Sequence, residues 1–202
     1  MSRRTDVALA ALALVVASPL LALIAVVVRL TSPGPVLYRQ TRVRKGGAEF
    51  ELRKFRTMRP GSDPVGIGTA VGESDPRVTA VGRLLRRTSL DELPNLFDFL
   101  RGEMAIVGPR PTIPAQVELY TPHQLRRREV KPGLTGWAQV SGHVSVPWEE
   151  RIELDVFYVE HRSPAFDRRI IARTVRLVLG GGLTSEPPSS RVPREWESPP
   201  PE

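Results

Sequence analysis

The sequence contains no cysteine and only three histidines among its 202 residues. The lack of cysteine excludes a disulfide framework and any thiolate metal site. The histidines, His123, His143 and His161, do not have the HExxH spacing of a histidine-based zinc site. Any bound metal is therefore expected to have oxygen ligands, which favours a hard cation such as Mg²⁺.

Negative charge is also scarce relative to positive charge. The chain has 29 Lys and Arg residues against 22 Asp and Glu residues, a net charge of +7. This balance predicts an anionic partner: nucleic acid, a membrane surface or a phosphorylated substrate. The sequence shows no helix-turn-helix, zinc-finger or RNA-recognition signature, so nucleic acid is not the expected partner.

One long segment, residues 7–28, has no charged residue at all. As a helix it would be about 33 Å long, enough to cross the hydrocarbon core of a bilayer. A cleaved signal peptide is disfavoured, because the run is longer than an ordinary signal core and Arg29 follows it in place of a small-residue cleavage site. The segment is predicted to be a membrane helix that stays attached to the chain.

Ser18-Pro19 lies in the middle of this run. Proline removes a helical hydrogen bond and clashes with the preceding turn, and a neighbouring serine hydroxyl can satisfy the freed carbonyl in lipid. Both flanks of the run are basic, and Lys and Arg near membrane ends favour the cytoplasmic side. A re-entrant helix that bends and returns to the side it entered is favoured over a single-pass anchor.

Short secondary-structure elements are predicted to follow. Residues 36–43 and 49–58 have the pattern of two strands joined by a turn at Lys45-Gly46-Gly47. The basic side chains of Lys54–Met58 (KFRTM) are expected to face an anionic ligand, lipid headgroups or solvent. Residues 78–87 are predicted to form a helix, and a second helix is predicted from Ser89 to Gly102.

The start of this second helix holds two adjacent acids, Asp91 and Glu92, close to Arg86. Ser89 and Glu92 match the S-x-x-E capping box, so helix capping is one interpretation. The second acid and the flanking arginines are not explained by capping, and they favour a catalytic or metal-binding interpretation. A carboxylate at a helix N-terminus stays ionised, as a nucleophile or an Mg²⁺ ligand must be. Pattern alone leaves both interpretations open.

The C-terminal part of the chain has three further features. Lys131–Gly136 is a turn-rich loop, and helices are predicted from Trp148 to about Glu160 and from Pro164 onward. Asp155 is either a buried polar partner or part of a substrate site. The last helix alternates apolar residues with arginines, the pattern of a helix lying in a membrane interface, although an ordinary surface helix has a similar pattern. Residues 183–202 are predicted to be disordered.

The run from Arg86 to Pro111, RRTSLDELPNLFDFLRGEMAIVGPRP, closely resembles the signature of the bacterial sugar transferase family, the monotopic polyprenyl-phosphate phosphoglycosyl transferases. Further segments agree with the family in order: Ser18-Pro19, Ser32-Pro33-Gly34-Pro35, KFRTM at 54–58, DPRVT at 75–79, KPGLTGWAQ at 131–139 and WEERIELD at 148–155. Among the few departures, Asp98 stands where asparagine is common. None of them touches the acid pair, and the chain resembles the minimal catalytic form of the family.

The resemblance implies an α+β fold, mainly helical, with a re-entrant membrane helix at residues 1–30. A small cytoplasmic catalytic domain with a short β-hairpin and amphipathic interface helices would occupy residues 31–182, before the tail at 183–202. The implied location is the bacterial inner membrane, with the catalytic domain on its cytoplasmic face among membrane lipids.

The resemblance also implies a reaction: transfer of a sugar 1-phosphate from a UDP-sugar to undecaprenyl phosphate, with Mg²⁺ required and UMP released. Asp91 would be the nucleophile that forms a covalent phospho-sugar intermediate, and Glu92 its partner near the metal. Arg86 and the turn Pro109-Arg110-Pro111 would bind the phosphates or the nucleotide. The alternative is a non-catalytic membrane-anchored scaffold of polysaccharide assembly. The sequence identifies neither the sugar, the pathway nor the oligomeric state.

Overall fold

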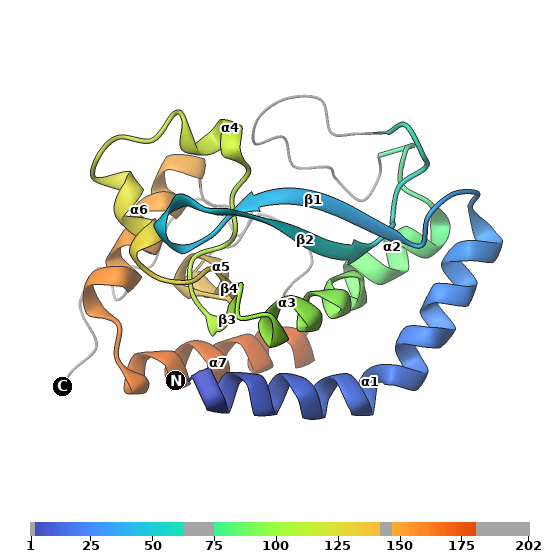
Figure 1. Ribbon diagram of the computed structural model, residues 1–202, viewed down its shortest axis with the longest axis horizontal. Coiled ribbons are helices and arrows are strands. Elements are labelled where there is room, and N and C mark those ends of the chain that lie inside the picture. Colours follow the sequence, from blue (N-terminus) through green and yellow to red (C-terminus); the bar gives the residue numbers. More distant parts are fainter. Residues whose placement is uncertain (1–2, 63–74, 142–146, 181–202) are drawn as a thin grey trace. The chain divides into compact units, whose positions relative to one another are not determined.

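The computed structural model describes residues 3–62, 75–141 and 147–180 (Figure 1). The predicted tail at 183–202 lies outside the described residues. The protein is mainly helical with a short antiparallel sheet, as the sequence predicted. The chain forms two compact units. The first consists of Ser2–Arg42 with Phe50–Glu103, and the second of Val43–Glu49 with the chain from Met104 onward.

The first unit begins with the helix α1 (Arg3–Thr31), which contains Pro19. Figure 1 shows that α1 bends part of the way along its length. Pro19 has no N–H to donate to the carbonyl of Val15, one turn earlier, and the Ser18 hydroxyl donates to that carbonyl instead at 2.8 Å. The hydroxyl therefore replaces the backbone donor that the proline removes, as the sequence suggested.

Residues Ala10–Thr31 of α1 are long and apolar enough to cross a membrane. Much of this segment is exposed: Val15, Val16 and Leu30 keep more than two-thirds of their surface accessible, at 71%, 73% and 80%. Helix α1 packs through its other side on Phe55 and Leu85, with Ile24 and Val28 buried between them. One face of α1 thus belongs to a protein core, and the exposed apolar face is suited to lipid.

The hairpin is formed by β1 (Leu37–Val43) and β2 (Glu49–Phe55), close to the predicted strands. The turn between them, η1 (Lys45–Gly47), is a 3-10 helix in which Gly46 and Gly47 have positive φ angles of 76° and 90°. Glycine adopts this conformation without steric cost, so the Gly-Gly pair sets the turn. The strands lie almost wholly in the first unit, and the turn lies in the second.

Three short helical elements complete the first unit: α2 (Ala80–Arg87), the 3-10 helix η2 (Leu90–Asn95) and α3 (Leu96–Leu100). Thr79 caps α2 by accepting a hydrogen bond from the Gly82 amide at 2.9 Å. The single helix predicted from Ser89 to Gly102 is therefore two pieces, with Pro94 inside the 3-10 piece. Proline cannot donate the hydrogen bond that a continuous α-helix needs at this position.

The second unit contains a parallel two-stranded sheet, β3 (Ala105–Val107) with β4 (Gly133–Thr135), that the sequence did not predict. Its helical elements are α4 (Pro114–Val117), the 3-10 helix η3 (Gln124–Glu129), α5 (Trp137–Ser141), α6 (Trp148–His161) and α7 (Pro164–Leu179). The last two agree with the predicted helices. Ser163 caps α7 by accepting from the Phe166 amide at 3.1 Å.

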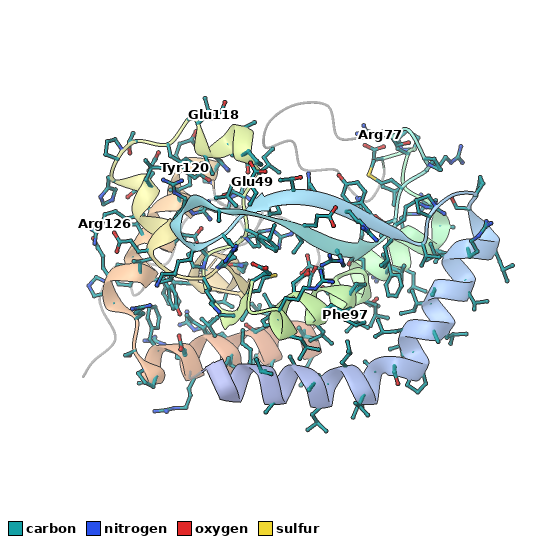
Figure 2. All side chains as sticks on the ribbon, viewed as in Figure 1. Glu49, Arg77, Phe97, Glu118, Tyr120 and Arg126 are labelled. Carbon is teal, nitrogen blue, oxygen red and sulfur yellow. The ribbon has the colours of Figure 1, made fainter. Side chains whose placement is uncertain are left out.

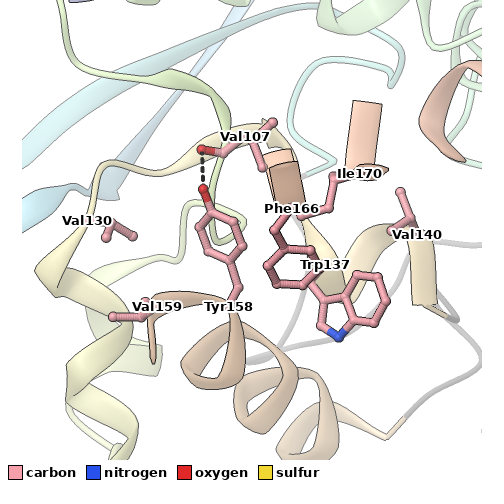
Figure 3. Packing of buried hydrophobic residues seen from close by; sticks show 8 residues of the cluster. All are labelled: Val107, Val130, Trp137, Val140, Tyr158, Val159, Phe166 and Ile170. Carbon is pink, nitrogen blue, oxygen red and sulfur yellow. Dashed lines mark hydrogen bonds between the residues drawn. The ribbon is translucent and has the colours of Figure 1, made fainter. Parts of the chain in front are cut away.

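The core of the second unit lies between α5, α6 and α7 (Figure 3). Phe166 and Ile170 of α7 are almost completely buried, and the ring of Phe166 packs edge-on against Trp137 with centroids 4.9 Å apart. The Tyr158 hydroxyl reaches the Val107 carbonyl at 3.4 Å and the Asp167 carboxylate at 2.8 Å. The buried ring of Tyr158, with its hydroxyl hydrogen-bonded at both positions, thus helps to hold β3 against the helices.

Three glycines let two backbone segments approach closely in this unit. A Cβ atom on Gly133 would lie 2.1 Å from the Gly108 nitrogen, and one on Gly136 would lie 2.2 Å from the Gly108 carbonyl oxygen. The Gly108 amide donates to the Thr135 carbonyl and the Gly133 amide to the Pro109 carbonyl, both at 2.9 Å. The KPGLTG loop is therefore the support of the turn Pro109-Arg110-Pro111.

Candidate active site

The residues predicted for the active site fall in both units. Arg86, Asp91 and Glu92 belong to the first unit, and Pro109, Arg110 and Pro111 belong to the second.

Arg86 lies in the last turn of α2 and is held by the KFRTM segment. Its Nε atom donates to the Thr57 hydroxyl at 2.9 Å. Helix α2 approaches Thr57 closely because Gly82 has no side chain: a Cβ there would lie 2.0 Å from the Thr57 carbonyl oxygen. The Thr79 amide also donates to this carbonyl, at 3.0 Å. Thr57 is a residue that sequence reasoning did not assign to the site, and it fixes the orientation of Arg86.

Asp91 and Glu92 lie in the first turn of η2. The predicted capping box is wrong: Ser89 has a left-handed backbone conformation (φ 56°, ψ 16°), and its side chain makes no capping hydrogen bond. The Glu92 carboxylate is paired with Lys54 of β2 and does not close a capping box. Both acids are partly buried. The interpretation of this pair as a helix cap therefore loses its support.

Arg53 and Arg56, two further basic residues in or next to KFRTM, make contacts inside the unit. Arg56 is buried and donates to the Ser32 carbonyl at 2.7 Å, next to Gly34, whose φ is 108°. Arg53 donates to the fully buried Asp98 carboxylate at 2.5 Å. Burial raises the pKa of the Asp98 carboxyl, and the Arg53 guanidinium opposes that shift. The motif is thus largely a scaffold that connects β2 to the SPGP turn, η2 and α3.

Arg86 is surrounded by a small set of charges. Burial lowers the pKa of its guanidinium, and the negative charges of Asp91 and Asp75 oppose this effect. Asp75 accepts hydrogen bonds from Arg77, from Nη2 at 2.7 Å and from the backbone amide at 2.9 Å. These bonds, more than the charge of Arg86, lower the pKa of Asp75 to about 2. Asp91 thus lies within electrostatic range of a partly desolvated arginine, an arrangement suited to an anionic ligand.

An apolar cavity of about 600 Å³ lies in the same unit as the acid pair. The bent helix α1 contributes Ser18, Leu21 and other residues to its lining, and Phe55, Pro94 and Phe97 contribute the rest of the wall. Phe97 on α3 is labelled in Figure 2. Pro94 and Phe97 lie within five residues of Glu92 in the chain, and Phe55 directly follows Lys54, the partner of Glu92. The segments that carry the acids therefore also line the cavity.

In the second unit, Pro109 and Pro111 are buried and Arg110 between them is exposed. The Val43 amide donates to the Thr112 carbonyl at 2.8 Å, which adds a third backbone tie to the two made by the KPGLTG loop. Prolines on both sides restrict the backbone of the turn. The turn is consequently rigid, and it presents an arginine outward.

The predicted Mg²⁺ can be tested against these residues. No group of three or more His, Asp or Glu side chains converges in the part of the chain that the structure describes. Asp91 and Glu92 offer two carboxylates, and Mg²⁺ in phosphate-binding sites is commonly held by one or two carboxylates together with phosphate oxygens and water. The donor set therefore fits a Mg²⁺ ion that arrives with a phosphorylated substrate.

The family model for bacterial sugar transferases matches residues 1–181, and the chain belongs to this family. Among its relatives, an uncharacterized sugar transferase, EpsL, of Bacillus subtilis is 46% identical over 153 residues, which are 76% of this chain and 74% of the relative. The UDP-glucose:undecaprenyl-phosphate glucose-1-phosphate transferase of Escherichia coli is 43% identical over 87% of this chain and 39% of its own length.

A third relative is named for a different sugar. The UDP-N-acetylgalactosamine-undecaprenyl-phosphate N-acetylgalactosaminephosphotransferase of Aeromonas hydrophila is 38% identical over 89% of this chain. The match covers 44% of that protein, so the chain spans less than half the length of this relative and of the Escherichia coli one. Because those two names specify different sugars at similar identity, kinship alone does not select a sugar for this chain.

Proposed function

We propose that this protein transfers a sugar 1-phosphate from a UDP-sugar to undecaprenyl phosphate and releases UMP. The observation that carries the proposal is the placement of Asp91 and Glu92 in one turn, with Asp91 within electrostatic range of Arg86, which Thr57 holds in place. Membership of the sugar transferase family supports the same reaction class. The product would be the first membrane-bound intermediate of exopolysaccharide, O-antigen or glycoconjugate synthesis.

In the proposed reaction, a carboxylate oxygen of Asp91 attacks the phosphorus that carries the sugar. The bond from this phosphorus to the bridging oxygen breaks, and UMP leaves with that oxygen and its electron pair. An oxygen of undecaprenyl phosphate then attacks the same phosphorus and displaces Asp91, which forms the lipid diphosphate sugar and restores the carboxylate. Arg86 and Arg110 are proposed to bind phosphate or nucleotide groups through charge-assisted hydrogen bonds.

Glu92 is the proposed partner of Asp91 near the metal. Lys54, which pairs with Glu92, holds that carboxylate in place. When bound, Mg²⁺ would be held by Asp91, Glu92 and phosphate oxygens and would offset the negative charge of the diphosphate.

The apolar cavity beside the acid-bearing segments supports a lipid acceptor. Its lining is almost entirely hydrocarbon, which suits an isoprenoid chain better than a water-soluble acceptor.

The test of the function is an assay of UMP release from a panel of UDP-sugars with undecaprenyl phosphate in detergent. At least one UDP-sugar is expected to yield UMP in an amount equal to the lipid-linked sugar, and removal of Mg²⁺ by EDTA is expected to stop the reaction. A chain that releases no UMP with any member of the panel would contradict the proposal.

The competing proposal, a non-catalytic scaffold, requires only the anchor and the basic surface. A substitution in the acid pair that removes activity while the protein remains bound to membranes would exclude it. The bend in α1 and the paired acids favour the enzyme, because a scaffold needs neither feature.

The bend in α1 supports a re-entrant topology, with residues 1–30 dipping into the inner membrane from the cytoplasmic face. Because the chain has no cysteine, single cysteines at Ser2 and Thr41 can be labelled specifically. Both positions are expected to react with an impermeant thiol reagent only when the cytoplasmic face is accessible. Labelling of the two positions from opposite faces would show a single-pass anchor.

A further inference from the structure

The second unit contains a buried arginine that the proposed reaction does not use. Arg127 is the middle one of three successive arginines in η3, and only 5% of its surface is exposed. Its neighbour Arg126 extends outward, where it pairs with Glu129 and Glu160 (Figure 2). Arg127 instead extends into the unit, where a charged side chain is costly unless it is fully paired.

The guanidinium of Arg127 joins three separate segments. One terminal nitrogen, Nη1, donates to the Tyr120 hydroxyl at 2.5 Å. The other, Nη2, donates to the Arg110 carbonyl at 3.0 Å and pairs with the Asp155 carboxylate of α6. Asp155 is therefore a buried polar partner, one of the two roles that the sequence left open.

A buried ion pair is not expected to be retained for stability alone, because well-packed apolar side chains of similar size often stabilise a fold as much or more. Here the pair has a specific geometric effect. The turn around Arg110 has proline on both sides, so its backbone offers few amide donors for support. Arg127 holds the carbonyl of Arg110 itself, whereas the backbone ties described above hold residues on either side of it.

The electrostatics at this turn suit an anion. Burial, followed by the positive charge of Arg110, lowers the pKa of the Arg151 guanidinium on α6. Arg110 and Arg151 thus lie within electrostatic range of each other, and the nearby Asp155 is engaged by Arg127. An excess of positive charge remains beside the exposed Arg110, as a phosphate-binding position requires.

We propose that Arg127 is a positioning residue for the donor substrate: it fixes the backbone of Arg110, with Asp155 orienting its guanidinium, so that the Arg110 side chain meets a phosphate of the nucleoside diphosphate. This inference rests on the proposed function, since it takes Arg110 as a phosphate-binding residue. Arg127 itself is buried and does not contact the substrate.

The test uses the full chain in detergent and UDP with Mg²⁺ as the probe, because UDP is common to all candidate donors. The variant Arg127→Met/Asp155→Leu removes both charges together, so it leaves no unpaired buried charge. We expect it to unfold within a few degrees of the wild-type protein and to bind UDP about 10- to 100-fold more weakly, the scale of effect of a small misplacement of a binding group. Hydrogen exchange of the amides between Gly108 and Thr112 is expected to become faster.

Two controls separate positioning from general damage. Arg126→Met alters the adjacent exposed arginine and should leave both the UDP affinity and the exchange unchanged. In an Arg110→Ala background, the Arg127→Met/Asp155→Leu pair should cause no further loss of affinity, because Arg127 acts through Arg110. If the double variant fails to fold, Arg127→Lys keeps the charge but loses the planar fork, and it should weaken UDP binding in the same direction.

An unchanged UDP affinity would overturn the inference, and so would a loss that adds in full to that of Arg110→Ala. Faster exchange with unchanged affinity would show a purely structural pair and would overturn it equally. A wild-type chain that does not bind UDP would contradict the proposed function, and the inference with it. A wild-type chain that binds UDP, with variants that do so equally well, would contradict the inference alone.

Discussion

Replacing Asp91 with asparagine is expected to lower UMP release by about 10³-fold or more, the scale on which loss of a catalytic nucleophile is measured. The amide keeps the size of the carboxylate but is neutral, so it neither attacks phosphorus nor binds Mg²⁺ well. In the structure Asp91 lies in the first turn of η2, and its negative charge interacts with the Arg86 guanidinium. The substitution is therefore expected to change the chemistry and leave the fold intact.

Intact-protein mass spectrometry checks this expectation at the first step. After exposure to the UDP-sugar donor alone, the wild-type chain should gain the mass of a sugar phosphate, and Asp91→Asn should gain nothing. Glu92→Gln keeps the nucleophile, so it should form the adduct more slowly. Glu118→Gln, an exposed acid near α4 (Figure 2), is a matched surface control and should behave as the wild type. Full turnover by Asp91→Asn would refute the covalent mechanism.

Replacing Gly133 with alanine is expected to be among the most destabilising single substitutions in the chain, at about 3 to 5 kcal/mol of unfolding free energy. The new Cβ would lie 2.1 Å from the Gly108 nitrogen and 2.4 Å from the Thr135 carbonyl oxygen. These two backbone atoms are hydrogen-bonded to each other at 2.9 Å, so neither can move without breaking that bond. A large loss of stability follows because the interior has no space into which the methyl group can shift.

Denaturant or thermal unfolding measures this effect. Gly46→Ala is the control, since a Cβ at Gly46 would have no neighbour within 4 Å and its φ of 76° costs only local strain, about 1 to 2 kcal/mol. A Gly133→Ala variant as stable as Gly46→Ala would show that the close approach of the two segments is not required for folding.

The sequence predicted the elements whose cause is local. Pro19 predicted a disturbance of α1, which bends but continues as one helix, and Ser18 supplies the hydroxyl that replaces the lost hydrogen bond. The hairpin was predicted equally well, because Gly46 and Gly47 determine the turn and the strands beside it. Helices α6 and α7 followed from their apolar spacing.

Predictions failed where a distant partner decides the local structure. The S-x-x-E pattern at Ser89 predicted a capping box, but Lys54, 38 residues earlier than Glu92, pairs with that acid. The β3–β4 pairing joins two three-residue strands far apart in the chain, which are too short to show a periodic pattern. No local signal marked Thr57 or Arg127 either, because their roles depend on which segments pack against them.

The chain passes between its two units at residues 42–43, 49–50 and 103–104. Neither unit is therefore a contiguous stretch that can be excised or exchanged at one cut. A chimera that replaced only the segment from Met104 onward with that of a relative would keep the original hairpin turn, Val43–Glu49, and join it to a foreign partner. A chimera that keeps both units intact must therefore carry this seven-residue segment together with the C-terminal segment.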